Sequence, residues 1–137
     1  MKKIPKIETV KIITKKLAEI LRIQDWDIDV YIVSGYEMAK QTENDDSTAY
    51  GLSCRNIRLN KADVYLNYDN MDDWYKTLVH ELIHIQTTSM VMTAIAYFEE
   101  KHSYFTDIYE SMVDKQAVVF CKVYPVTNFD EIIKGEK

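Results

Sequence analysis

The segment His80-Glu81-Leu82-Ile83-His84 constrains this chain more than any other part of its sequence. The apolar residues around and within it predict a buried helix. Histidines four positions apart on a helix point the same way, so both imidazoles can bind one metal ion. The carboxylate of Glu81 then lies within reach of a water on that metal. The spacing predicts a zinc site with Glu81 as general base. The competing interpretation is a pair of histidines on an amphipathic helix without metal.

A catalytic zinc ion usually has three protein ligands and one water, so a third ligand must come from elsewhere. The downstream candidates are Glu99, Glu100, His102, Asp107, Glu110 and Asp114. We favour Glu110, because Asp114 follows it four residues later on the same helix face. Asp114 could then accept a hydrogen bond from the free N–H of a ligating histidine. Ala117 and Cys121 continue this stripe with small apolar side chains, which predicts that the stripe faces inward.

Two alternatives to this ligand set stay open. His102 could complete a three-histidine site, although its neighbours Glu100-Lys101-His102-Ser103 read as an exposed helix end. Glu110 and Asp114 could instead be the solvated face of an amphipathic helix.

Length and composition exclude several classes of protein. A chain of 137 residues with 47% hydrophobic and 28% charged residues is typical of one globular domain, here spanning 1–137. The net charge is −5, and no basic patch interleaved with aromatic residues indicates a nucleic-acid partner. No segment has the ~20 apolar residues of a membrane helix, and no signal peptide is recognisable. Cys54 and Cys121 are expected to be reduced thiols, which favours a cytoplasmic location. The oligomeric state is not readable.

The pattern of apolar residues predicts the order of the elements. An amphipathic helix is expected over 7–23, with Val10, Ile13, Leu17, Ile20 and Leu21 on its buried face. Alternation predicts strands over 26–32, 49–55 and 63–67, with Ser34-Gly35 ending the first strand and a mobile polar loop over 41–48. Asn70-Met71-Asp72-Asp73 is expected to supply the N-cap and acidic first turn of the helix that carries the histidines, and further helices are expected over 87–102 and over 105–123, where Pro125 ends the last. This order predicts an α+β domain whose sheet of about three strands covers the metal-bearing helix.

Two motifs carry a resemblance to a known group of enzymes. The segment Thr77 to His84 and the segment Tyr109 to Ala117, which reads E-x-x-x-D from Glu110 to Asp114, resemble the zincin metallopeptidases of the gluzincin type. The small size and element order look like the minimal, prophage-type zincins, including relatives of the ImmA/IrrE peptidases. The resemblance covers roughly residues 26–121. Ile83 stands where ImmA-like sequences often have glycine or alanine, which leaves the family within the zincins open.

The resemblance implies a zinc-dependent endopeptidase. His80, His84 and Glu110 match the zinc ligands, Glu81 the general base, and Asp114 the partner of a zinc histidine. A protein or peptide substrate would bind in extended form along a sheet edge, at 49–55 or 63–67. Tyr104 and Tyr109 are candidate donors to the oxyanion, although packing is the commoner role of such tyrosines. The alternative function is a zinc-binding regulatory or interaction protein with little or no proteolytic activity.

Overall fold

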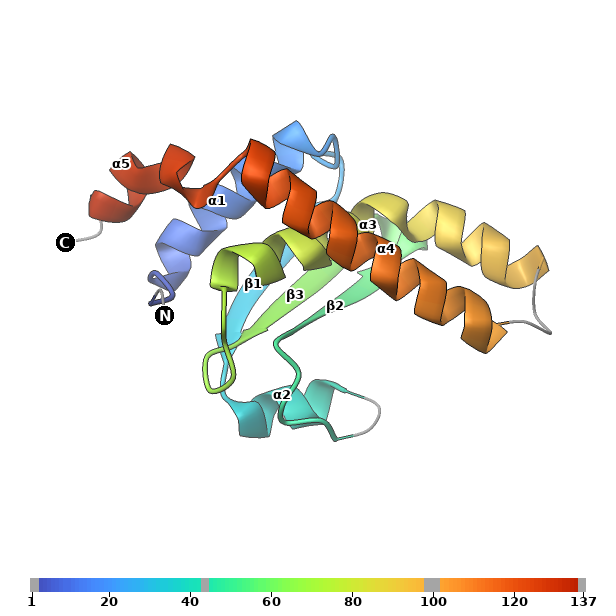
Figure 1. Cartoon of the computed structure of the whole chain (residues 1–137). Helices are drawn as coiled ribbons and strands as arrows, with labels where there is room; N and C mark the ends of the chain where they lie inside the picture. The colour runs from blue at the N-terminus through green and yellow to red at the C-terminus, as the bar shows by residue number, and fades with distance from the viewer. Residues whose placement is uncertain (1–2, 43–44, 98–101, 136–137) are drawn as a thin grey trace.

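The computed structural model describes residues 3–42, 45–97 and 102–135, and its helices and strands form an α+β structure (Figure 1). The predicted fold class is therefore confirmed at this level. The elements are α1 Ile7–Ile20, β1 Asp27–Val33, α2 Gly35–Gln41, β2 Gly51–Asn56, β3 Lys61–Asn67, α3 Trp74–Tyr97, α4 His102–Val123 and α5 Asp130–Lys134, with short 3-10 helices at Ile57–Leu59 and Val126–Phe129.

The first helix packs its apolar stripe against β1 and the core. Val10, Ile13 and Leu17 are fully buried, as their spacing predicts. The helix ends at Ile20, three residues earlier than expected, and Ile20 itself is exposed. Arg22 then adopts a left-handed conformation with φ of 60°. The predicted place of Ile20 on the buried face is wrong, whereas Leu21, one residue past the helix, is buried as predicted.

The three strands are ordered β1-β3-β2, with β3 in the centre. β1 pairs with β3 in parallel, and β2 pairs with β3 in antiparallel fashion. Ala62, Val64 and Leu66 of β3 are buried, as expected for a central strand. Because both sides of β3 are hydrogen-bonded, the segment 63–67 cannot offer an edge to a substrate, and that expectation is wrong. Among the described strands, β2 pairs only with β3, so its other edge is not hydrogen-bonded to a strand.

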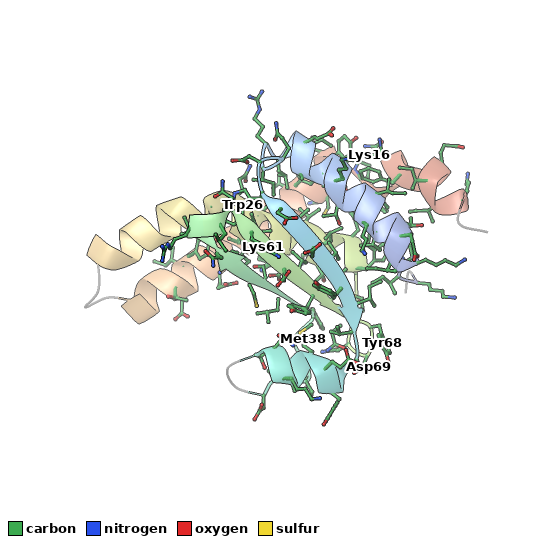
Figure 2. All side chains as sticks on the ribbon, turned by 180° about the vertical axis from the view of Figure 1, so that it is seen from behind. Lys16, Trp26, Met38, Lys61, Tyr68 and Asp69 are labelled. Atoms are coloured by element: carbon green, nitrogen blue, oxygen red, sulfur yellow. The ribbon has the colours of Figure 1, made fainter. Side chains whose placement is uncertain are left out.

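The helices α3 and α4 are layered on one face of the sheet. α3 packs on β2 and β3, and α4 packs along α3. Seen from behind, the strands lie in front of α3 and α4, and α2, marked by Met38, lies beyond one end of the strands (Figure 2). On this outer face the rings of Tyr31 and Tyr65 stack with centroids 5.2 Å apart. The sheet therefore covers the predicted metal-bearing helix from one side, as expected.

The segment after β1 departs from its prediction, because it forms α2 instead of continuing as a turn and loop. Ser34 caps this helix, since its Oγ accepts the backbone N–H of Glu37 at 3.1 Å. The later part of the predicted mobile loop is anchored to the end of β3. Asn67 is fully buried and donates from Nδ2 to the carbonyl oxygens of Ser47 at 2.8 Å and Ala49 at 3.0 Å. These bonds fix the chain just before β2. Glu43 and Asn44 lie outside the described residues.

The C-terminal segment closes the core beside the start of α3. The hydroxyl of Tyr75 donates to the carbonyl of Tyr124 at 2.8 Å, and Phe129 is buried against the Tyr75 ring. Pro125 follows the end of α4, as predicted. Within the described ranges, no helix combines the length and the apolar character needed to cross a bilayer.

Candidate metal centre

His80 and His84 lie one turn apart on α3, which a polar cap and an apolar face hold in place. Asp73 precedes the helix, and its Oδ1 accepts the backbone N–H of Lys76 at 3.1 Å. Leu78 and Leu82 are fully buried against the sheet. His84 is buried at 6% exposure, whereas His80 is partly open to solvent. The separately predicted helix over 87–102 is instead a continuation of α3 to Tyr97.

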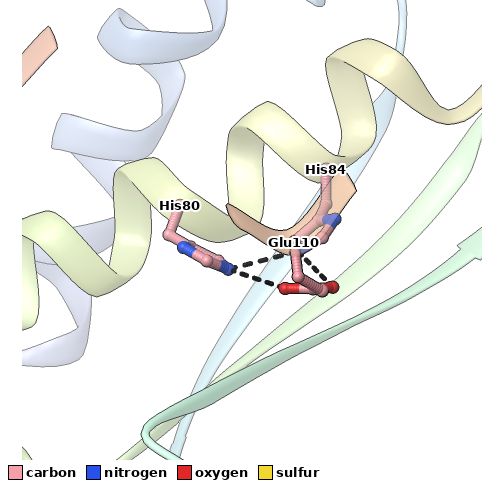
Figure 3. A group of neighbouring side chains, drawn as sticks. All are labelled: His80, His84 and Glu110. Atoms are coloured by element: carbon pink, nitrogen blue, oxygen red, sulfur yellow. Dashed lines mark hydrogen bonds and ion pairs between the residues drawn. The ribbon is translucent and has the colours of Figure 1, made fainter. Parts of the chain in front are cut away.

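Glu110 of α4 meets both histidines (Figure 3). The Nε2 atoms of His80 and His84 are 3.2 Å apart. Oε1 of Glu110 lies 3.2 Å from Nε2 of His84, and Oε2 lies 3.6 Å from Nε2 of His80. In a tetrahedral site with Zn–N and Zn–O bonds of 2.0–2.2 Å, two ligand atoms are separated by roughly 3.3 Å. The three side chains could therefore hold a metal ion such as zinc, and Glu110 approaches each histidine through a different carboxylate oxygen.

The face of α4 that carries Glu110 differs from the predicted inward stripe. The buried positions are Tyr109, Val113 and Ala117. Glu110 and Asp114 flank this buried line, and their side chains remain 52% and 53% exposed. The sequence placed both carboxylates on the correct helix and beside the histidines. They lie half exposed at the surface, however, and not inside the core.

Each histidine has a polar partner behind it at Nδ1. For His80, this partner is Asp114, whose Oδ1 lies 3.7 Å away. Asp114 is shared, because Nζ of Lys76 lies 3.4 Å from the same oxygen. The structure therefore brings Asp114 to the place that the sequence predicts, beside a histidine of the motif, with a lysine that the sequence did not indicate.

The partner of His84 is Tyr109, which forms a chain of hydrogen bonds between α3 and α4. Thr87 donates from Oγ1 to the carbonyl of Ile83 at 3.0 Å, so its oxygen can accept the Tyr109 hydroxyl at 2.5 Å. The Tyr109 oxygen then accepts Nδ1–H of His84 at 2.9 Å. This direction leaves the lone pair on Nε2, which faces His80 and Glu110. Tyr109 thus sets the tautomer that a metal ligand needs.

The candidate general base, Glu81, is buried between α3 and β2. It is 7% exposed, and Ser53 of β2 hydrogen-bonds its carboxylate. Burial raises the pKa of Glu81, and the neighbouring histidines oppose that rise. A carboxylate with a raised pKa is better able to hold a proton during a reaction. Gly51 makes room for it, since a Cβ there would lie 3.3 Å from Oε2 of Glu81 and 2.6 Å from Cγ2 of Thr77.

The electrostatics of the cluster favour a cation. Burial lowers the pKa of His80, but the hydrogen bond of Glu110 and the charges of Glu81, Glu110 and Asp114 outweigh it, so the pKa is raised overall. When Nε2 of each histidine carries a proton in place of a metal ion, His80 and His84 hydrogen-bond Glu110 and hold its pKa well below its usual range. Three carboxylates therefore surround two imidazoles, and either a proton or a metal ion can supply the balancing positive charge.

A cleft of about 280 Å³ opens in front of this cluster. It runs along the N-terminal half of α3, between the start of β2 and α4. Its lining consists of Tyr50, Gly51, Asp72, Asp73, Lys76, Thr77, His80, Glu81 and Asp114. A substrate in this cleft would lie directly against His80 and Glu81.

The other candidates from the sequence do not join the cluster within the described part of the chain. Asp107 is exposed on α4, and the ligand trio does not include it. Glu99 and Glu100 lie outside the described residues, as do the side chains of His102 and Tyr104. Tyr109 was a candidate oxyanion donor, but its hydroxyl binds His84 and Thr87. No local spacing indicates this role, because it depends on Thr87 of α3 lying across from Tyr109.

Comparison with known proteins adds no family to this geometry. No family model, no curated protein and no solved structure matches the chain.

Proposed function

We propose that this chain is a zinc-dependent metallopeptidase of the gluzincin type, with His80, His84 and Glu110 as the metal ligands. The observation that carries the proposal is the convergence of these three side chains at ligand spacing beside a buried glutamate in an open cleft. A structural zinc site is usually closed by four protein ligands, whereas a catalytic site leaves one position open. The trio, together with the cleft, matches the second arrangement.

The residues of the chain would divide the reaction between them. Bound zinc would supply a Lewis acid that polarises the scissile carbonyl and acidifies a water molecule. Glu81 would accept the proton of that water at its carboxylate and deliver it to the leaving amine. Asp114 would keep His80 oriented, and Tyr109 would keep His84 oriented, each through the Nδ1 atom of the histidine. Arg55 of β2 donates to the carbonyl of His84 at 3.2 Å, which fixes the helix against the strand beside the cleft.

The unpaired edge of β2 supports a peptide as the substrate. An extended peptide can add to a free strand edge through main-chain hydrogen bonds. β2 begins at Gly51, which lines the cleft together with Glu81. A chain paired with this edge would therefore pass the candidate metal centre.

Elemental analysis of tag-free protein, combined with peptide hydrolysis, tests the proposal. We expect one zinc per chain in the wild type and in Glu81→Gln, but hydrolysis of a mixed peptide library by the wild type alone. Glu110→Ala should lose the zinc, and Asp107→Asn on the same helix should keep both metal and activity. If the wild type takes up no zinc even when metal is added, the proposal is wrong. Stoichiometric zinc without hydrolysis would instead support a zinc-binding regulatory protein.

A further inference from the structure

The cleft beside the metal centre has an uneven distribution of charge. At the N-terminal end of α3, away from His80, the lining carries Lys76 in the first turn and Asp72 and Asp73 just before the helix, while Tyr50 supplies an aromatic ring. Both aspartates are exposed, and half of the Tyr50 surface is exposed as well. This end of the cleft is therefore open to a ligand.

The single lysine does not neutralise the aspartates, because it is paired elsewhere. Its Nζ lies 3.4 Å from Oδ1 of Asp114. Asp73 accepts the backbone N–H of Lys76 through Oδ1, which caps the helix without removing the negative charge. The helix N-terminus contributes only about half a positive charge, against two full negative charges. The far end of the cleft therefore attracts cations.

The distance from this end to the metal centre matches a short stretch of peptide. Asp73 precedes His80 by seven positions, which is about 10 Å along a helix. An extended peptide covers that length in about three residues at 3.3 Å each. A basic side chain on one of these residues could reach the two carboxylates, and the face of the Tyr50 ring could bind the same cation.

We propose that the substrate of this cleft is a peptide with lysine or arginine within about three residues of the scissile bond, bound by Asp72, Asp73 and Tyr50. The inference rests on the proposed peptidase function, because it places the basic residue relative to the bond that is cut. Asp72 and Asp73 are then the residues that determine the preference for a basic side chain.

The test compares a double variant, Asp72→Asn with Asp73→Ser, against Asp25→Asn. Serine is a good helix cap, so Asp73→Ser removes the charge and retains the capping of α3. Asp25 is an exposed aspartate outside the cleft and serves as a control for net charge. Cleavage sites in a mixed peptide library are read by mass spectrometry. Peptides that differ only in one lysine, glutamine or glutamate near the mapped site then give relative kcat/KM values.

We expect cuts to lie near basic residues, and lysine to exceed glutamine in kcat/KM. An exposed charge contributes about threefold, so the lysine-to-glutamine ratio should fall roughly tenfold in the double variant. It should stay unchanged in Asp25→Asn, and it should shrink at about 1 M salt, where exposed charges are screened. Hydrolysis without a basic preference, or with a preference for glutamate that depends on Lys76, would overturn this inference while leaving the peptidase proposal intact.

A binding measurement decides the inference separately from hydrolysis. Fluorescent lysine, glutamine and glutamate peptides are titrated into Glu81→Gln protein, with and without added zinc. The lysine peptide should bind about tenfold more tightly than the glutamine peptide, and the double variant should abolish the difference. Equal binding of all three peptides would contradict the inference, even if the protein cleaves nothing.

Discussion

At the scale of single residues, Glu110 is the only link between α4 and the two histidine Nε2 atoms among the described side chains. Glu110→Ala should therefore weaken zinc binding more than 100-fold, since even the loss of a residue behind a ligand costs 10- to 100-fold. Its side chain is half exposed, so the fold of the zinc-free variant should be preserved. Zinc affinity is measured by competition with a chromophoric chelator, and circular dichroism reports the fold. Unchanged affinity would exclude Glu110 as a ligand.

Tyr109→Phe tests how the second histidine is held. The change removes one hydroxyl and leaves the ring in the core, so His84 loses the acceptor for Nδ1–H. We expect zinc affinity to fall about 10- to 100-fold, because the tautomer is no longer fixed. Tyr124→Phe is a matched control on the same part of the chain, outside the cluster. Equal affinities in Tyr109→Phe and the wild type would show that the Tyr109 hydroxyl does not act on the metal ligand.

The sequence predicted the site residues that are set by spacing along one helix. It did not predict the roles that arise where two separate elements pack together. His80, Glu81 and His84 follow from one helical turn, and Glu110 with Asp114 from another. Tyr109 could be named but not assigned, because its role depends on Thr87 lying across from it on α3. Gly51 gave no signal at all. Its importance arises only where β2 meets Thr77 and Glu81 in space.

At the scale of elements, the contact between β2 and α3 positions Glu81, the proposed general base. Gly51→Ala would put a Cβ 2.6 Å from Cγ2 of Thr77 and 3.3 Å from Oε2 of Glu81. Such overpacking typically costs about 1–3 kcal/mol, and we expect a loss of that size in urea unfolding of the zinc-free protein. Peptide hydrolysis should fall as well, because Glu81 must move.

Thr77→Ser supplies the matched control for this contact, since it deletes the methyl group that would clash. Combined with Gly51→Ala, it should recover most of the lost stability, giving a coupling free energy of about 1 kcal/mol or more in a double-mutant cycle. Additive effects of the two changes would mean that the close contact is not the source of the loss.

The short helices α2 and α5 were not predicted from the sequence, and α2 shows how one signal can hide another. Ser34-Gly35 was interpreted as the end of a strand because glycine favours turns. The same serine starts the four-residue pattern Ser34 to Glu37, which is a helix-capping signature. In the structure, Ser34 caps α2 by accepting the backbone N–H of Glu37. The helix is also short, so its few residues carry no readable period.

At the scale of the whole molecule, the order of strands could not be predicted from local patterns. The last strand along the chain becomes the central one, and β1 joins it in parallel only after the chain has passed through α2 and β2. Alternation of apolar residues indicates that a strand exists and which face is buried, but not which strand it pairs with. For this reason the sequence could not decide which of two strands, 49–55 or 63–67, would offer an edge to a substrate.

The proposed zinc ligands come from both α3 and α4, so zinc should stabilise the folded molecule in a pH-dependent way. In the zinc-free protein the pKa of His80 is raised, so its contribution to stability is full below its unfolded pKa of about 6.5 and is lost as pH rises through the folded value. Protons and zinc compete for this imidazole, so zinc should replace the lost stabilisation at higher pH. Free zinc at about 1,000 times its Kd adds about 4 kcal/mol, or roughly 10 °C in Tm.

Thermal unfolding with zinc and with a chelator, measured from pH 6 to pH 8, checks this expectation. The Tm of the zinc-free protein should fall across this range more steeply than that of the loaded protein, so that the gap between them widens with pH. In Glu110→Gln the zinc-free slope should be shallower, because one of the negative charges that raise the pKa of His80 is gone. Parallel Tm curves for the two states of the wild type would mean that zinc does not compete with a proton at His80, and that the ion binds outside the His80–His84–Glu110 cluster.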